Sequence, residues 1–246
     1  MMDDSRNGGV PDAAIVLAAG LGKRMRPLTE TVPKPLVRVA GSPLIDHGLD
    51  ALARTGIGHA VVNVHYLADQ VVDHVATRAT PSVAISDERD RLLDSGGGVR
   101  HALAQARPGP VALLNADTFW IDAPGTDNLR DLASAWRPEA MDMLLMLAPL
   151  ASAVGHTGSG DFAFAEGTAI ERSREGHVYA GAAILKPEIF IGDEPEVHSL
   201  NLHFDRLIER GRLHGHVMDG LWLTVGTPDA IGAAEAAIVD YRAAAA

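Results

Sequence analysis

Short apolar runs alternate with amphipathic segments along roughly the first 150 residues, and this alternation limits the fold more than any other feature. The apolar runs are typical of buried strands and lie at 13–18, 59–65, 82–86, 110–115 and 142–147. The segments between them carry apolar residues at helical spacing and lie at 43–55, 68–77, 97–106 and 128–136. Alternating strands and helices favour βαβ units. We therefore predict an α/β fold with helices on both faces of a mainly parallel sheet.

The pattern changes after about residue 150, where short alternations and glycines replace the long helical segments. The predicted elements are hairpins at 155–178 and 213–225, a strand at 179–185, and helices at 198–210 and 228–241. The last helix follows Thr227, a suitable N-cap residue, and has Pro228 in its first turn. This half of the chain makes the predicted sheet mixed rather than purely parallel.

Neither an internal repeat nor a long linker divides the chain, so we expect residues 13–246 to form a single domain. Residues 1–12 are polar and acidic without an apolar segment, which is typical of a flexible leader and not of a signal peptide. Within the domain we expect a first half at 13–150, a second half at 151–227 and a C-terminal helix at 228–246.

Composition excludes several classes of function. The 246 residues include no cysteine, so disulfides, thiolate metal sites and a cysteine nucleophile are excluded. A net charge of −11 argues against a general nucleic-acid binder. No apolar run reaches the length of about 18 residues that a membrane span requires. A cytoplasmic enzyme without a nucleic-acid or membrane partner fits these observations.

Positive charge nevertheless gathers in one stretch, IVLAAGLGKRMRPLTETVPKPL, which runs from Ile15 to Leu36. A dinucleotide-binding G-x-G-x-x-G needs a third glycine where this chain has Met25. A P-loop needs Ser or Thr after Gly-Lys, where this chain has Arg24. What remains is a buried strand, a glycine turn and clustered cations.

This combination is suited to a polyphosphate ligand. Ligands of open parallel sheets bind outside the carboxyl ends of the strands. Gly20 and Gly22 allow the backbone to approach phosphate oxygens and to donate N–H groups to them. The planar guanidinium of Arg24 can grip phosphate, and Lys34 supplies a compact charge on a segment that Pro33 and Pro35 stiffen. The alternative is a solvated turn whose cations cluster without a ligand.

The stretch LAAGLGKRMRPLTETVPKPL closely resembles the signature of the sugar-1-phosphate nucleotidylyltransferases, and the resemblance extends from about Ala13 to Ala236. Further matching motifs occur in the family's order: VAGSPLIDH, VNVHYLADQ, LLDSGGGV, LNAD, YAGAAILKPEIF and GLWLTVGTPDAI. Among its subgroups, the chain most resembles the N-acetylmuramate α-1-phosphate uridylyltransferases. The resemblance implies a Rossmann-like three-layer sandwich of the nucleotide-diphospho-sugar transferase type. Hexapeptide repeats are absent, so we expect no left-handed β-helix domain.

The resemblance also implies the reaction. Family members transfer a nucleotidyl group from a nucleoside triphosphate to a sugar 1-phosphate and release pyrophosphate, with Mg²⁺ as cofactor. The attacking phosphate oxygen is already anionic, so catalysis needs positioning and charge neutralisation and no general base. For this chain the implied pair is UTP and N-acetylmuramate 1-phosphate, in cell-wall (peptidoglycan) recycling, with the protein a monomer or homodimer.

The resemblance assigns roles to residues of both halves. Residues 13–150 would bind the nucleotide and 151–227 the sugar phosphate. The implied catalytic residues are Arg24, Lys34 and Asp117, with Asp117 as the Mg²⁺ ligand. The implied nucleotide-binding residues are Ala18, Ala19, Gly20, Gly22, Asn63 and a glycine loop of Gly96, Gly97 and Gly98 beside the base. The implied sugar-side residues are Asn115, Asp161, Gly181 and Asn201.

The alternatives to these roles are structural. Asp117 could be a turn or helix cap, and the three glycines could be a plain turn before a helix. His65 lies near the end of a predicted strand and has either a ligand-side or a packing role. His214 and His216 alternate on a predicted strand, where a solvated face is favoured over a metal site.

The chain departs from the family at one acidic position. The family usually carries aspartate in a W-x-D pattern, and here Trp222 and Leu223 are followed by Thr224. A hydroxyl is a weaker ligand for Mg²⁺ than a carboxylate. Either Asp117, substrate phosphates and water hold the metal, or Asp219 reaches the site, or activity has been lost.

These observations leave rival functions. Within the enzyme class, guanylyl or cytidylyl transfer to another sugar phosphate or to phosphocholine competes with uridylyl transfer. A non-catalytic subunit that senses nucleotides or sugar phosphates is the alternative that Thr224 favours. Metal-dependent release of pyrophosphate separates an enzyme from a sensor, and a scaffold protein would show no preference for nucleotides.

Overall fold

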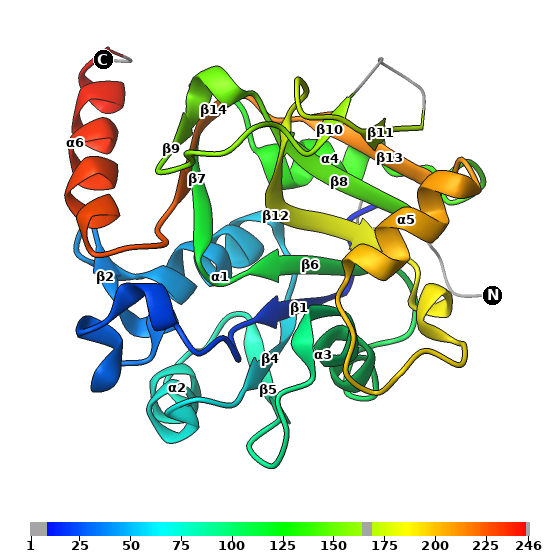
Figure 1. Cartoon of the computed structure of the whole chain (residues 1–246), viewed down its shortest axis with the longest axis horizontal. Helices are drawn as coiled ribbons and strands as arrows, with labels where there is room; N and C mark the ends of the chain where they lie inside the picture. Colours follow the sequence, from blue (N-terminus) through cyan, green and yellow to red (C-terminus); the bar gives the residue numbers. More distant parts are fainter. Residues whose placement is uncertain (1–8, 164–168, 245–246) are drawn as a thin grey trace.

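A seven-stranded sheet forms the centre of the molecule (Figure 1). The computed structural model describes residues 9–163 and 169–244. The sheet strands are β1 (Ala13–Leu17), β4 (His59–Val64), β5 (Ser82–Asp87), β6 (Val111–Asn115), β8 (Met143–Ala148), β12 (Val178–Leu185) and β13 (Leu213–Val217). Their order is β13-β8-β12-β6-β1-β4-β5, and β12 runs antiparallel to both of its neighbours while the other pairs are parallel. The predicted mixed, mainly parallel sheet is confirmed.

Helices cover both faces of this sheet. The side chains of β1 show why, since Ala14 and Val16 belong to one buried cluster and Ile15 belongs to another. The first cluster packs under α1 (Leu44–Thr55), α2 (Ala68–Ala76) and α4 (Asn128–Ala135). The second packs under α3 (Asp94–Leu103) and α5 (Asn201–Glu209). A strand that is apolar on both faces thus requires a helical layer on each side, as the three-layer prediction expected.

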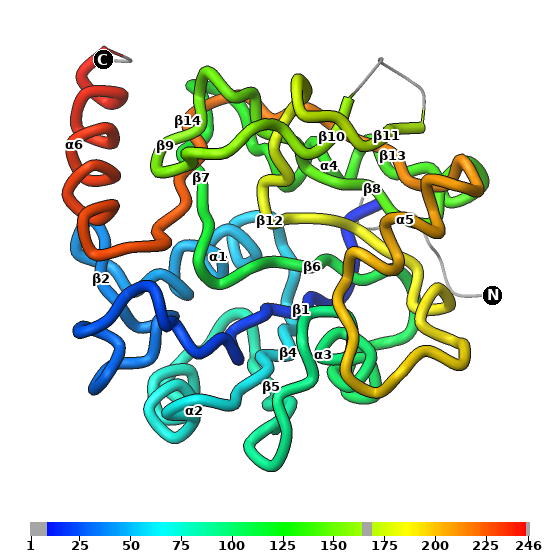
Figure 2. Tube along the Cα trace, in the orientation of Figure 1, coloured from blue at the N-terminus to red at the C-terminus, as the bar shows by residue number. Residues whose placement is uncertain are grey.

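A smaller sheet lies beside the central one and carries the C-terminal helix (Figure 2). Its order is β7-β14-β9, with bounds Thr118–Asp122, Gly220–Thr224 and Ala153–Val154. Helix α6 (Asp229–Ala244) packs Ala234 and Ile238 into a third buried cluster with Leu223. Two-stranded ladders complete the fold: β2 (Arg38–Val39) with β3 (Ser42–Pro43), and β10 (Phe162–Ala163) with β11 (Glu171–Arg172).

The predicted hairpin at 213–225 is wrong. Strand β13 pairs in parallel with β8 at the edge of the central sheet, and β14 pairs antiparallel with β7 in the smaller sheet. Apolar alternation identifies a strand but not its partner, so two successive strands were assigned to each other. Strand β7 was not predicted at all.

The ends of two predicted segments also differ from the structure. Helix α3 begins at Asp94 and not at 97, and α5 begins at Asn201 and not at 198. Residues 1–8 of the predicted leader lie outside the described residues, but Val10 is only 9% exposed and joins the first buried cluster. Residues 164–168, within the predicted hairpins at 155–178, also lie outside the described part. No helix among the described residues is long and apolar enough to cross a membrane.

Candidate functional site

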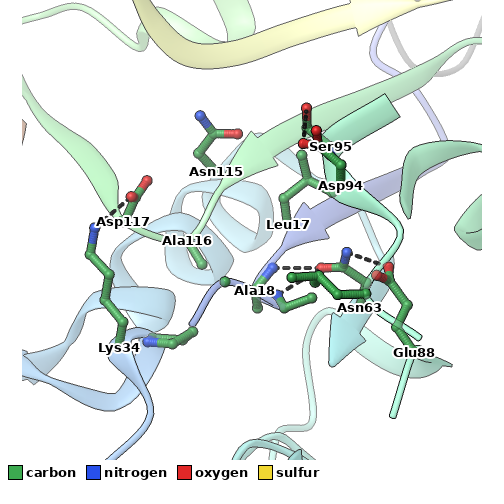
Figure 3. A pocket seen from close by; sticks show the side chains of 14 residues that line it. Leu17, Ala18, Lys34, Asn63, Glu88, Asp94, Ser95, Asn115, Ala116 and Asp117 are labelled. Carbon is green, nitrogen blue, oxygen red and sulfur yellow. Dashed lines mark hydrogen bonds and ion pairs between the residues drawn. The ribbon is translucent and has the colours of Figure 1, made fainter. Parts of the chain in front are cut away.

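A cavity of about 300 Å³ opens at the carboxyl ends of β1, β4 and β6 (Figure 3). The loops that follow these parallel strands meet there, which is the usual ligand position in an open α/β sheet. The residues that line it are Leu17, Ala18, Ala19, Gly20, Lys34, Pro35, Asn63, Glu88, Leu92, Asp94, Ser95, Asn115, Ala116 and Asp117. Ala18, Ala19, Gly20, Lys34, Asn63, Asn115 and Asp117 were predicted as site residues from the sequence, and the fold brings them together.

The turn after β1 requires glycine at position 22. Gly22 has a φ of +60°, and a Cβ there would lie 3.0 Å from Thr29 Cγ2 and 3.1 Å from Lys34 Cβ. The Thr29 hydroxyl donates a 2.8 Å hydrogen bond to the carbonyl of Gly22 and is itself buried. The threonine of the opening motif therefore holds the turn that the glycine makes, and the missing side chain at position 22 leaves room for Lys34 beside that turn.

Arg24 is exposed on the 3₁₀ turn η1 (Lys23–Met25), which the fully buried Met25 anchors. Its guanidinium lies beside Gly226, where a Cβ would be 3.7 Å from Arg24 Cζ. Both residues line a second hollow of about 220 Å³, which shares Gly20, Lys34 and Asp117 with the first. Arg24 has no ion-pair partner among the described residues, so its charge is available to an anion.

Lys34 and Asp117 form the charged centre between the two hollows. The Lys34 ammonium donates to Asp117 Oδ2 at 2.6 Å. Lys34 is only 9% exposed, and an unpaired ammonium at that depth would be costly, so Asp117 neutralises it. Lys34 begins the 3₁₀ turn η3 (Lys34–Leu36), and Pro33 just before this lysine and Pro35 just after it restrict the backbone on both sides.

Asp117 is suited to a hard cation as well as to Lys34. It lies between β6 and β7, and its carbonyl accepts a 3.2 Å hydrogen bond from the Val225 amide. Its side chain is 39% exposed, and Oδ1 has no hydrogen-bond partner within residues 9–163 and 169–244. Mg²⁺ commonly takes one or two carboxylates and completes its shell with phosphates and water. The donor set therefore fits Mg²⁺ held by one protein carboxylate together with substrate oxygens.

The resemblance implied a glycine loop at 96–98, but these glycines are helical, as the helical spacing at 97–106 predicted for Gly97 and Gly98. Gly96, Gly97 and Gly98 lie near the start of α3, all three are buried, and none lines the cavity. A Cβ at Gly96 would lie 2.6 Å from the His198 ring, and one at Gly98 would lie 2.8 Å from both Asn63 and Glu88. Three glycines favour a loop by propensity, but close tertiary packing overrides that preference here.

Sequence reasoning missed the residues that replace this loop at the cavity. Asp94 and Ser95 at the start of α3 line the wall, and Glu88 after β5 reaches it from below (Figure 3). Their signal in the sequence was weak, although Glu88 follows a predicted strand end, where ligand-side residues gather. His65 does not line the cavity, and its Nδ1 lies 2.7 Å from the Glu88 carbonyl.

The four predicted sugar-side residues fall into two groups. Gly181 has a φ of +79° and lies against Asn115, since a Cβ there would be 3.1 Å from Asn115 Nδ2. Asp161 and Asn201 instead line a separate, shallow hollow with Arg172. Asn201 Oδ1 accepts a 2.9 Å hydrogen bond from Arg172, and Asp161 Oδ2 accepts one from the Tyr179 amide.

Asp219 cannot replace the missing carboxylate at position 224. Thr224 pairs with Thr118 at the Asp117 end of β14, whereas Asp219 precedes the other end of that strand. At about 3.3 Å per residue the two positions are about 16 Å apart. Neither residue lines the hollows around Asp117. Because β14 is extended, Asp219 lies far from the site although it is only five residues from Thr224 in sequence.

The histidines at 214 and 216 do not form a metal centre. Both lie on β13, and no group of three metal-ligating His, Cys, Asp or Glu side chains occurs among the described residues. Burial lowers the pKa of His216 below its ordinary value. Their half-buried positions on an edge strand explain their alternation without a ligand.

Comparison with known proteins places this geometry in a family. Residues 14–150 match the model of the MobA-like NTP transferase domain. The chain is 44% identical over 238 residues to N-acetylmuramate alpha-1-phosphate uridylyltransferase of Caulobacter vibrioides, covering 94% of this chain and 98% of that relative. It is 33% identical over 220 residues to the protein of the same name from Neisseria meningitidis, covering 87% and 93%.

The fold has close structural relatives at low sequence identity. UDP-glucose pyrophosphorylase from Acinetobacter baumannii superposes with a TM-score of 0.74 at 18% identity, over 94% of this chain and 93% of that one. This likeness shows the fold, and the cavity lies at the strand ends, where open α/β sheets in general bind ligands.

Proposed function

This chain belongs to the MobA-like NTP transferase family and is a nucleotidyltransferase, and we propose that it transfers a uridylyl group from UTP to N-acetylmuramate 1-phosphate. The choice of substrates is supported by 44% identity along 98% of the length of a relative that carries this activity in its name. The observation that carries the reaction class is the Lys34–Asp117 pair, at 2.6 Å, between two hollows at the strand ends.

The reaction places negative charge where this chain supplies positive charge. A phosphate oxygen of the sugar phosphate attacks the α-phosphorus of the nucleotide in line, and the bond to pyrophosphate breaks. Arg24, whose guanidinium lacks an ion-pair partner in the described chain, binds the departing pyrophosphate. Lys34 exchanges the Asp117 carboxylate for the phosphate oxygens of the nucleotide. Because the attacking oxygen is anionic, catalysis rests on positioning and electrostatic stabilisation.

Mg²⁺ would be held by Asp117 with oxygens of the nucleotide phosphates and of water. When bound, it neutralises phosphate charge and fixes the geometry of the leaving group. Release of Lys34 from Asp117 leaves both Asp117 oxygens available. The separated pair can then bind phosphate through Lys34 and Mg²⁺ through Asp117. Thr224 is not needed as a ligand in this arrangement.

The two halves of the chain have different roles in this proposal. Residues 13–150 bind the nucleotide, with the base in the larger cavity between Ala18, Ala19 and the Asp94–Ser95 wall. Residues 151–227 complete the sugar side, where Gly181 packs on Asn115 at the cavity. Asp161 and Asn201, which line the separate shallow hollow, are assigned to larger sugar substituents.

A sensor subunit is the second candidate, and Thr224 in place of the family's carboxylate is the observation that favours it. One assay separates the two. Purified protein with Mg²⁺ is given UTP, CTP, GTP, ATP or dTTP, each with a panel of sugar 1-phosphates that includes N-acetylmuramate 1-phosphate, and pyrophosphate is followed. We expect release with UTP and N-acetylmuramate 1-phosphate. Nucleotide binding without release from any pair would support the sensor.

A further inference from the structure

A buried polar pair, Asn63 and Glu88, joins three loops beneath the cavity (Figure 3). Asn63 is the penultimate residue of β4 and Glu88 follows β5, and each residue is only 3% exposed. The Asn63 amide donates a 2.7 Å hydrogen bond to Glu88 Oε1. Polar groups at this depth destabilise the fold unless they are satisfied by hydrogen bonds, so their partners are informative.

The other partners of Asn63 belong to the turn after β1. Its Oδ1 accepts hydrogen bonds from the amides of Ala18, at 2.6 Å, and Ala19, at 3.2 Å. Together with the bond to Glu88, three of the four hydrogen bonds available to an asparagine side chain are used. Both lone pairs of the carbonyl are occupied by protein amides, so this oxygen is not available to a ligand.

The partners of Glu88 belong to the other two loops. Its Oε2 accepts a 3.1 Å hydrogen bond from the Leu93 amide, immediately before α3. Its backbone is tied to the end of β4, since its amide donates to Val64 and its carbonyl lies 2.7 Å from His65 Nδ1. Glu88 has no ion pair among the described residues, so its carboxylate is satisfied by the same hydrogen bonds that fix the loops.

Gly98 leaves room for this pair. A Cβ at that position would lie 2.8 Å from both Asn63 Nδ2 and Glu88 Oε1. Real Cβ atoms do not approach polar atoms so closely, so helix α3 can sit over the pair only with glycine there. This packing explains why a helix accepts glycine inside its first turns, where glycine is otherwise less favourable than alanine.

We propose that Asn63 and Glu88 are positioning residues for the nucleotide, which set the Ala18–Ala19 turn and the Leu93–Ser95 wall at the spacing that the base requires. This inference rests on the proposed nucleotidyl transfer. The sequence predicted that Asn63 binds the nucleotide directly. In this inference Asn63 acts through the backbone turn that it holds, and Glu88 acts through the wall of the cavity. Neither side chain takes part in the chemistry.

A reciprocal exchange of the two polar groups tests this role. Asn63→Asp alone sets two carboxylates against each other. Asn63 and the Leu93 amide both donate to Glu88. Glu88→Gln alone therefore sets the new side-chain NH₂ group against one of these two donors. The double variant restores the pattern, because the new amide at 88 donates to the new carboxylate at 63 while its oxygen accepts from Leu93. The carboxylate at 63 still accepts from Ala18 and Ala19.

Two readouts are followed in all four proteins. By calorimetry, we expect each single variant to weaken UTP binding by about 10- to 100-fold and the double variant to lie within about threefold of the parent. By NMR without nucleotide, the Ala18, Ala19 and Leu93 amides exchange faster in the single variants and recover in the double variant. A double variant as impaired as the worse single variant in both readouts would overturn the inference.

A matched control separates positioning from general destabilisation. Asn128, 2% exposed, donates a 2.8 Å hydrogen bond to Asp122 Oδ1, away from the cavity. Asn128→Asp therefore creates the same opposition of carboxylates, and we expect it to lower stability without weakening UTP binding to the folded protein. Equal weakening in this control would overturn the positioning role. If the parent binds no nucleotide, the proposed function fails, while amide exchange still decides whether the pair holds the loops.

Discussion

The ammonium of Lys34 lies 2.6 Å from the carboxylate of Asp117, although 83 positions separate the two residues in the chain. Each is presented at the same edge of the sheet, Lys34 by a proline-restricted turn and Asp117 by the segment after β6. In the proposed reaction Lys34 leaves Asp117 for the phosphate oxygens of the nucleotide and Asp117 becomes free to hold Mg²⁺, so this contact is the arrangement of the two charges before substrate binds.

Replacement of Asp117 tests that arrangement. Asp117→Asn removes the carboxylate that would hold Mg²⁺ and leaves the buried ammonium of Lys34 without a counter-charge. We expect pyrophosphate release to fall by at least about 100-fold, in the range seen when one electrostatic group is removed from an active site. Asp127→Asn is the control, because asparagine serves equally well at that helix N-cap, distant from the cavity. Retained activity in Asp117→Asn would contradict its metal role.

Restoration of a carboxylate at position 224 should strengthen metal use. Thr224 precedes Val225, whose amide bonds the Asp117 carbonyl, so an aspartate there adds a second negative group near the first. We expect Thr224→Asp to lower the Mg²⁺ concentration for half-maximal rate by about tenfold, since ligand charge strengthens binding of hard cations. Thr224→Val, of similar size, should leave it unchanged. An unaltered Mg²⁺ dependence in Thr224→Asp would show that position 224 does not face the metal.

Gly181 and Gly41 separate backbone strain from steric overlap. They have nearly equal φ values, +79° and +82°, but a Cβ at Gly181 would overlap the Thr118 hydroxyl whereas none crowds Gly41. We expect Gly41→Ala to cost about 1 kcal/mol of unfolding free energy and Gly181→Ala about 2 kcal/mol more, measured by urea denaturation. Gly181→Ala should also reduce turnover by displacing Asn115. Equal destabilisation of the two variants would argue against tight packing at Gly181.

His203 should make the protein less stable in acid. Burial, followed by the neighbouring His198, lowers the pKa of His203 from 6.5 to about 4. Its Nε2 lies 2.9 Å from that of His198. The unfolded chain therefore takes up a proton first as the pH falls from about 6.5 to about 4, and the folded state loses up to about 3 kcal/mol across this window.

Urea unfolding at several pH values measures this loss, with His203→Gln as the comparison because its amide can still bond His198. His47 and His216, whose pKa values burial also lowers, keep part of the pH dependence in both proteins. The difference between the two curves thus isolates His203. Parallel curves from pH 4 to 6.5 would show that His203 is not held neutral in the fold.

Local sequence determined the strands of the central sheet, the first helices and the glycine turn after β1. Ala13–Leu17 is apolar on both faces, and no environment other than a sheet covered by two layers buries it. Gly22 and Lys34 belong to one short motif, so the sequence of that motif was enough to predict that both lie at the same turn. These features depend on short-range conformational preferences, which a single sequence contains.

Tertiary structure decided what depends on distant partners. The helix needs glycine at 96–98 because His198, the Glu196 carbonyl, and the Asn63–Glu88 pair occupy the space of the missing side chains. The strands at 213–225 separated into two sheets because their better partners, β8 and β7, lie elsewhere in the chain. Asp219 is close to Thr224 in sequence and distant in space, since the strand between them is extended. Glu88 acquired its role only when folding buried it against Asn63, because hydrogen-bond partners across a core are set by packing and not by local pattern.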